Sequence, residues 1–399
     1  MPVIPRSTTD VSVLVPVLNE AATIGDAVSA MRSQEFDGTV EFLIADGGST
    51  DGTRTQLEQM AQDDPRVRVL ENPLKGTASG LNVCLSAACG EFVARMDAHS
   101  VFPPHYLKAG VERLRHNDVG WVAGPQVPEP RGRISQAVSA ALSTRLGRGA
   151  SRRWSCGDVE GCEFELDTGV FCGVWRREDL IALGGWDEGW PRNQDSELAA
   201  RFFESGRRIV CLPEMAALYF PRDSLSALWR QYRGYGFYRA KTAARHPRSL
   251  RRSAVLPPLL VIDAALAVAG PRRLRRAART GMLLYGTALL SAMKPTDASR
   301  PDPLVPVALA TMHAAHGVGF LHGAYRWGIP WSALRRVVLG PREERTGAEE
   351  GPIEALSPDP ARAASAEGPP PDDARTSRPF FRKRPPGTGV PHPTRRVRA

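Results

Sequence analysis

Several signals of common protein classes are missing from this chain. None of its six cysteines lies in a C-x-x-C spacing, so we expect scattered reduced thiols rather than a zinc site. No basic stretch followed by an apolar run opens the sequence, so no secretory signal is expected. No apolar run reaches the roughly 20 residues of a clear membrane span. The absence of a G-x-G-x-x-G motif disfavours a dinucleotide-binding fold.

Positive charge exceeds negative charge over the 399 residues. The chain holds 52 Lys and Arg against 43 Asp and Glu, a formal net charge of +9. Such a balance indicates an anionic partner: a nucleic acid, a phosphorylated substrate or an anionic membrane. The arginines are not interleaved with aromatic residues and no nucleic-acid motif is present, so we expect no nucleic-acid partner. The length allows one large or two moderate domains.

The first hundred residues alternate between strand and helix patterns. Apolar runs predict strands at 11–17, 41–45, 67–70 and 91–96, and helical periodicity predicts helices at 20–33, 51–60 and 78–88. This alternation predicts an α/β fold, a Rossmann-like and mostly parallel sheet with helices on both faces. Ligands of such sheets bind beyond the carboxyl ends of the strands. Three polar clusters should therefore meet there: Asn19-Glu20, Asp46-Gly47-Gly48 and Asp97-Ala98-His99.

One of these clusters is the sequence from Arg95 to His99. Asp97 and His99 stand two residues apart at a strand end, so their side chains should point the same way and could hold a divalent cation. The alternative is an ordinary strand end with a solvated carboxylate and a hydrogen-bonded imidazole.

A second cluster is the glycine-rich turn that follows the second strand. A well-capped turn would explain its glycines and Asp51 but would not explain Asp46. The Asp46 carboxylate could accept a hydrogen bond from a base or from a ribose hydroxyl.

Five segments with recognisable polar residues follow one another along the chain: 15–20, 46–53, 97–99, 184–188 and 192–198. Together they resemble the family 2 glycosyltransferases, which have the GT-A fold. The resemblance covers about residues 10 to 245, and His99 stands in place of the second aspartate of the family's Asp-x-Asp motif. Segments 97–100, 192–195 and 312–320 are most similar to the ExoA-type branch of bacterial exopolysaccharide (succinoglycan) glucosyltransferases.

The resemblance implies where a nucleotide-sugar would bind. Pro16 and Glu20 would flank the uridine, and Asp46 would contact the uracil. Lys75 lies where the family's third strand leads to a donor-binding turn, and Asp97 would sit near the ribose. We therefore expect a nucleotide-diphosphate sugar as a substrate.

The resemblance also implies a metal and a catalytic base. Asp97 and His99 would bind Mn²⁺ or Mg²⁺ beside the diphosphate, with the imidazole modestly favouring Mn²⁺. Asp195 would be the base that activates the acceptor hydroxyl in an inverting transfer. The alternative is that Asp195 or Ser196 only caps the helix that follows.

Two further segments are candidates for the acceptor side. Thr168 and Gly169 lie in the place of the family's acceptor loop. Gln231, Arg233 and Tyr235 lie in the place of the Gln-x-x-Arg-Trp motif of processive members, where this chain has glycine and tyrosine instead of arginine and tryptophan. These three could hold a diphosphate or stack on a sugar, or could belong to an amphipathic helix packed under the site.

The chain changes character towards its C-terminus. We expect a catalytic domain at 1–247, a helical and membrane-associated region at 248–335, and a disordered tail rich in proline and arginine at 336–399. The arginines between 272 and 279 suit a cytoplasmic loop or a surface that contacts anionic lipid. A soluble helical subdomain is the alternative.

The sequence therefore predicts an inverting glycosyltransferase at the cytoplasmic face of the cell membrane. It would move a hexose from a UDP-sugar to a lipid-linked or polysaccharide acceptor in exopolysaccharide or envelope glycan synthesis. One alternative is a non-catalytic component that binds nucleotide-sugars within a membrane assembly. A nucleotidyltransferase would need a Gly-rich, basic triphosphate loop, which residues 15–24 lack.

Overall fold

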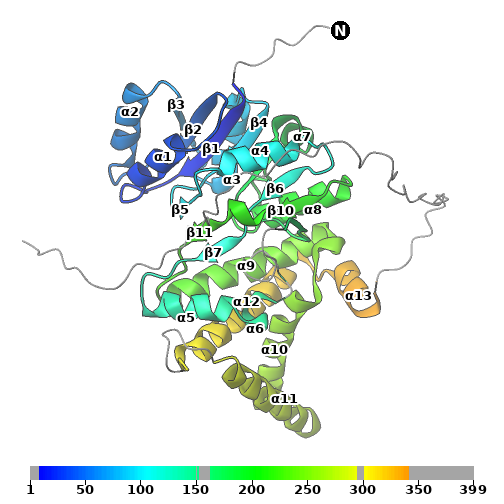
Figure 1. Cartoon of the computed structure of the whole chain (residues 1–399). Coiled ribbons are helices and arrows are strands. Elements are labelled where there is room, and N and C mark those ends of the chain that lie inside the picture. Colours follow the sequence, from blue (N-terminus) through cyan, green and yellow to red (C-terminus); the bar gives the residue numbers. More distant parts are fainter. Residues whose placement is uncertain (1–8, 150, 152–161, 294–300, 341–399) are drawn as a thin grey trace, which may run out of the picture. The chain divides into compact units, whose positions relative to one another are not determined.

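The computed structural model describes residues 9–149, 151, 162–293 and 301–340 (Figure 1). All seven elements predicted for the first hundred residues are present. Only the first helix differs by more than three residues at an end, because a turn at Glu20–Thr23 delays its start to Ile24. The elements are β1 (Val11–Val17), α1 (Ile24–Arg32), β2 (Val40–Asp46), α2 (Thr53–Asp63), β3 (Val67–Glu71), α3 (Thr77–Ala87) and β4 (Phe92–Arg95).

These strands belong to a mixed sheet whose order among the described residues is β3-β2-β1-β4-β9-β6-β10-β8. The first four run parallel, and β1 is apolar and almost wholly buried, as expected of a strand covered on both faces. The added strands are β6 (Trp121–Ala123), β8 (Phe164–Glu165), β9 (Gly173–Arg176) and β10 (Ile209–Cys211). β9 runs antiparallel between β4 and β6, so the sheet departs from the parallel pattern in its second half.

A smaller sheet and several helices complete the part that precedes residue 247. The smaller sheet has the order β5-β11-β7, from Ser100–Val101, Ala217–Tyr219 and Gln126–Pro128. The helices are α4 (Tyr106–Leu114), α5 (Arg133–Leu142), α6 (Arg145–Arg148), α7 (Arg177–Ala182), α8 (Gln194–Glu204), η2 (Pro213–Met215) and α9 (Leu225–Arg245). Trp121, Trp175 and Phe202 pack between the sheet and these helices and fix the second half of the sheet.

The loops that follow β1 and β2 brace each other. The amide of Asn19 donates to Ser49 Oγ at 2.8 Å, and its side-chain oxygen accepts from the amide of Thr50 at 2.8 Å. The amide of Glu20 donates to Thr53 Oγ1 at 2.8 Å. Two segments about 30 residues apart are thereby held together at the carboxyl edge of the sheet, where the polar clusters were expected to meet.

The C-terminal helices pack under this core (Figure 1). They are η3 (Pro247–Ser249), α10 (Arg252–Ala269), α11 (Arg272–Ser291), α12 (Leu304–Trp327) and α13 (Trp331–Leu339). α12 lies along α9, and glycines let the two helices come close together. A Cβ atom on Gly236 or on Gly319 would lie 2.0 Å from a backbone oxygen of the facing helix. The expected domain boundary at residue 247 falls between α9 and α10 and stays a prediction.

Two of these helices, α10 and α12, are long and apolar enough to cross a membrane by length and composition. Each helix extends beyond the apolar run seen in the sequence, since α10 begins at Arg252 and α12 ends at Trp327. Buried residues make up 11% of α10 and 44% of the apolar window of α12. The arginines at 272–279 lie in the first turns of α11 and not in a loop. Most of the predicted tail, residues 341–399, lies outside the described residues.

Candidate active site

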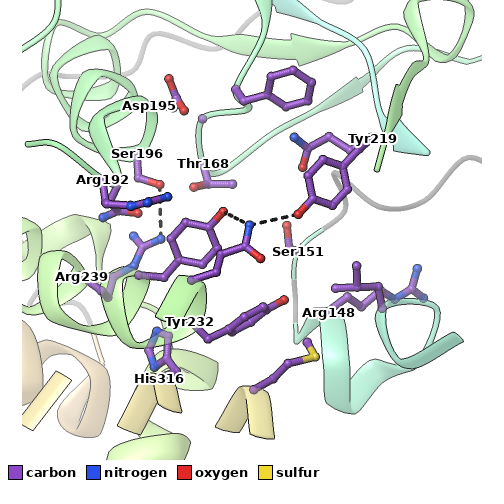
Figure 2. A pocket seen from close by; sticks show the side chains of 18 of the residues that line it. Arg148, Ser151, Thr168, Arg192, Asp195, Ser196, Tyr219, Tyr232, Arg239 and His316 are labelled. Carbon is purple, nitrogen blue, oxygen red and sulfur yellow. Dashed lines mark hydrogen bonds between the residues drawn. The ribbon is translucent and has the colours of Figure 1, made fainter. Parts of the chain in front are cut away.

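A cavity of about 430 Å³ opens at the carboxyl edge of the sheet and extends down to α9 and α12 (Figure 2). Residues far apart in the sequence, from Pro16 to His316, line it. They come from the strand ends of β1 and β4, the start of α8 and one face of α9, among other elements. Most of the predicted site residues lie in this lining. They are Pro16, Asp97, His99, Thr168, Gly169, Asp195, Gln231 and Tyr235.

A buried arginine joins Asp195, the predicted base, and Asp97, the predicted metal ligand. Arg95 Nε and Nη2 donate to the two oxygens of Asp97 at 2.7 and 2.9 Å, and Nη1 donates to Asp195 Oδ1 at 2.7 Å. The side chain of Arg95 is 4% exposed and that of Asp195 is 18% exposed. Burial acts to lower the pKa of the guanidinium, but the charges of Asp97 and Asp195 outweigh it and raise that pKa. Arg95 is therefore a permanent buried cation between the two carboxylates.

Asp195 stands in the first turn of α8, facing the cavity. The N-cap residue of this helix is Asn193, so the alternative in which Asp195 or Ser196 is the N-cap is wrong. A carboxylate in the first turn interacts favourably with the helix dipole. The backbone of Gly169 packs directly on this turn, since a Cβ atom there would lie 2.2 Å from the carbonyl oxygen of Asp195. Gly169 thus lets the loop before β9 approach the predicted base.

Three residues predicted for the nucleotide lie beside the cavity and outside its lining. Asp46 is buried and accepts from Ser49 Oγ at 2.6 Å, so the turn itself uses this carboxylate. Lys75 has a left-handed backbone, and its Cα lies close to the turn that begins at Gly47. Glu20 Oε1 lies 3.2 Å from His99 Nδ1, and that hydrogen bond lowers the pKa of Glu20.

The predicted metal ligands form a partial set. Among the described residues, no three His, Cys, Asp or Glu side chains gather around one metal-sized position. Both oxygens of Asp97 accept from Arg95, although each carboxylate oxygen retains a second lone pair. The half-exposed imidazole of His99 lies next to Glu20. These side chains fit a cation that would take most of its ligands from a bound diphosphate.

Hydrogen bonds order the predicted acceptor side on α9. Gln231 Nε2 donates to the hydroxyl oxygens of Tyr219 and Tyr235, each at 3.0 Å, and this amide is buried at the cavity wall (Figure 2). Arg233 points away from the cavity, where its Nη2 lies 3.3 Å from His322 Nδ1. Of the three candidates on this helix, only Gln231 and Tyr235 are in place to contact a ligand in the cavity.

Sequence reasoning assigned no role to Arg95, Arg192, Arg239 or His316, all of which line the cavity. Arg95 could have been found, because it stands two residues before Asp97 on the same strand and shares its face. The others come from α8's leading loop, α9 and α12. No local pattern in the sequence brings them together.

Comparisons with known proteins identify the family of this chain. The family model "Glycosyl transferase family 2" matches residues 12–154. "Succinoglycan biosynthesis protein ExoA" of Rhizobium meliloti (strain 1021) is 30% identical over 319 residues, 77% of this chain and 93% of that protein. "UDP-Glc:alpha-D-GlcNAc-diphosphoundecaprenol beta-1,3-glucosyltransferase WfgD" of Escherichia coli is 28% identical over 115 residues, 29% of this chain and 44% of that protein.

A solved structure shares the fold. The mannosyltransferase PcManGT from Pyrobaculum calidifontis, in complex with GDP-Man and Mn²⁺, superposes with a TM-score of 0.52 at 21% identity. The alignment covers 81% of this chain and 90% of that one. At this identity the likeness concerns the fold.

Proposed function

The chain belongs to glycosyl transferase family 2 and has the GT-A fold, and on that premise we propose that it is an inverting hexosyltransferase of exopolysaccharide synthesis. Its donor is a UDP-sugar, and its acceptor is a lipid-linked or polysaccharide glycan at the cytoplasmic face of the membrane. The observation that carries the proposal is one cavity in which Asp97 and Asp195 face the same space and are held by the same arginine.

In this proposal Asp195 is the general base. It takes the proton of the acceptor hydroxyl as the acceptor oxygen bonds to the anomeric carbon, while the bond from that carbon to the diphosphate breaks. The nucleoside diphosphate leaves with the electron pair of the broken bond. Arg95 donates a hydrogen bond to one oxygen of Asp195, which limits the motion of the base. A positioned base of this kind contributes about 10²–10⁴-fold to the rate.

The nucleotide would bind at the braced loops that follow β1 and β2. Pro16 lines the cavity, and the turns that hold Glu20, Asp46 and Lys75 lie beside it. Asp97 and His99 would hold Mn²⁺ or Mg²⁺, which when bound would neutralise negative charge on the leaving diphosphate. The presence of Mn²⁺ with GDP-Man in PcManGT supports the choice of a divalent cation.

The C-terminal helices support a membrane site. α10 exposes Leu256, Leu259 and Ile262, and the arginines of α11 lie on an exposed surface suited to anionic lipid. The name of WfgD describes an acceptor on a diphosphoundecaprenol lipid, which supports a lipid-linked acceptor here. A binding protein without catalysis is the second candidate, although a pure binder has no need of Asp195.

Release of the nucleotide tests the proposal. The detergent-solubilised chain would be mixed with Mn²⁺, a lipid extract that contains acceptors, and UDP-sugars or GDP-sugars in parallel. The proposal predicts acceptor-dependent release of UDP from one of the UDP-sugars, with inverted configuration in the product. Binding of a UDP-sugar without any release would favour the non-catalytic candidate, and turnover only with GDP-sugars would overturn the choice of nucleotide.

A further inference from the structure

The charge of the cavity is uneven. Within the part of the chain that the structure describes, its lining holds the carboxylates of Asp97 and Asp195, and both are already paired with Arg95. Beyond this triad and three histidines, the acidic and basic residues of the same lining are all arginines: Arg148, Arg192, Arg222, Arg239 and Arg251. Of these, Arg251 also pairs with Asp167. The excess of guanidinium groups predicts an anionic ligand in the lower part of the cavity.

Two of the guanidinium groups lie close to the proposed base. Arg239, on α9, donates from Nη2 to Ser196 Oγ at 3.3 Å, one residue beyond Asp195 (Figure 2). The side chain of Arg192 lies across α9 at Gly234, with its Cδ 3.6 Å from where a Cβ atom of that glycine would be. A larger residue at this position would occupy the space that Arg192 fills. The two arginines thus flank α8's first turn on the side away from the sheet.

Unpaired polar atoms mark the same part of the cavity. His316 Nδ1 on α12 and Ser151 Oγ are buried and have no hydrogen-bond partner among the described residues. Both side chains line the cavity, on opposite sides of Tyr232 in Figure 2. Buried polar atoms without a partner cost free energy, so their presence here indicates a ligand or water that satisfies them.

The helices that close this part of the cavity are the apolar ones. Ser253, Ala254 and Pro257 of α10 and Met312 of α12 contribute to its lining. The other face of α10 is exposed and apolar. A ligand with an anionic group in the cavity and a hydrocarbon chain would therefore find an apolar helix surface next to its binding site.

We propose that Arg192 and Arg239, with His316 and Ser151, bind the diphosphate of a lipid-linked acceptor, whose hydrocarbon chain follows α10. The inference rests on the proposed function, since it assigns the acceptor's anchor group to the same cavity. Guanidinium groups suit this role because each can donate two parallel hydrogen bonds to phosphate oxygens. The donor's own diphosphate would lie at the strand ends beside Asp97, on the other side of Asp195.

Binding of a short lipid diphosphate by the full chain tests this directly. The probes are farnesyl diphosphate, farnesol and inorganic diphosphate, each titrated by calorimetry in detergent with UDP and Mn²⁺ present. We expect farnesyl diphosphate to bind most tightly. Arg192→Gln and Arg239→Gln should each weaken it about 10-fold or more, as expected for a lost charge-assisted hydrogen bond, and Arg239→Lys should recover part of the affinity.

Arg233→Gln is the matched control, because Arg233 lies on the same helix and points away from the cavity. It should leave the affinity for farnesyl diphosphate unchanged, and the affinity for UDP should be the same in all variants with wild-type melting temperatures. Unchanged binding of farnesyl diphosphate in the Arg192 and Arg239 variants would overturn the proposal. If the variants lost as much affinity for UDP as for farnesyl diphosphate, the two arginines would belong to the donor site. If inorganic diphosphate bound as tightly as farnesyl diphosphate, the hydrocarbon chain would make no contribution and the ligand would not be a lipid.

These results are separable from failure of the proposed function. If the wild-type chain releases no UDP from any sugar but binds farnesyl diphosphate through Arg192 and Arg239, the transferase proposal fails and the lipid site stands. If it transfers sugar but the two variants retain the acceptor KM of the wild type, only the lipid site fails.

Discussion

Replacement of Arg95 by methionine should destabilise the fold far more than the loss of an ordinary ion pair. Methionine keeps much of the volume of the buried stem but leaves the carboxylates of Asp97 and Asp195 without their shared cation. Three charge-assisted hydrogen bonds are lost from a side chain that is 4% exposed. Removal of one partner from a buried ion pair typically costs about 3–5 kcal/mol, and we expect a decrease of that size in the free energy of unfolding.

The matched control is Arg208→Met. Arg208 also joins two carboxylates, those of Asp118 and Glu165, but its side chain is 47% exposed. Water screens such a pair, so the expected loss is at most about 1 kcal/mol. Urea unfolding followed by tryptophan fluorescence, in the same detergent for every variant, would compare the two. The double variant Arg95→Met/Asp97→Asn should recover part of the loss, because one unpaired charge is removed.

An equal decrease in the free energy of unfolding in Arg95→Met and Arg208→Met would contradict this role of Arg95. So would additive effects, in which Asp97→Asn destabilises the Arg95→Met variant as much as it destabilises the wild type. Either result would mean that Arg95 does not hold the two carboxylates as one buried unit.

Three further predictions concern other parts of the chain. Gly169→Ala should lower kcat by about 100-fold through displacement of Asp195, with little change in donor KM, as steady-state kinetics would show. The hydrogen bond of His246 with Glu197, opposed by burial and aided by Glu204, raises the pKa of His246 above its usual 6.5. Its stabilising charge is therefore complete below about pH 6.5 and is lost as the pH rises through the raised pKa, so the melting temperature should fall from pH 6 to 9 in the wild type and less in His246→Gln. Replacement of the α11 arginines by glutamine should reduce co-sedimentation with anionic vesicles, and high salt should reduce that of the wild type. Equal co-sedimentation of the wild type and the glutamine variant would refute a lipid contact of these arginines.

The first half of the fold could be predicted because its signals are local. The apolar run at Val11–Val17 and the periodic helices beside it define parallel strands without knowledge of the rest of the chain. The second half of the sheet could not be predicted in this way. β9 is only four residues long and enters between β4 and β6 from about 80 residues further along, so its place depends on packing against Trp121 and not on a repeat in the sequence.

The candidate site likewise combines residues that could be predicted from the sequence with residues that could not. The resemblance to a family selected Asp97 and Asp195, and the structure brings both to one cavity. The pairing of Asp195 with Arg95 depends on a contact across 100 residues. Arg192 was inaccessible to sequence reasoning for the same reason, since its place over Gly234 is set by how α8's leading loop packs on α9.

The most direct test of the central claim is the turnover of the Asp195→Asn variant at saturating donor and acceptor. Asparagine keeps the shape of the side chain and can still accept from Arg95, but it cannot take a proton from the acceptor hydroxyl. We expect a kcat about 10²–10⁴-fold below the wild type, with an unchanged affinity for the nucleotide-sugar. Wild-type turnover by this variant would contradict the assignment of Asp195 as the base.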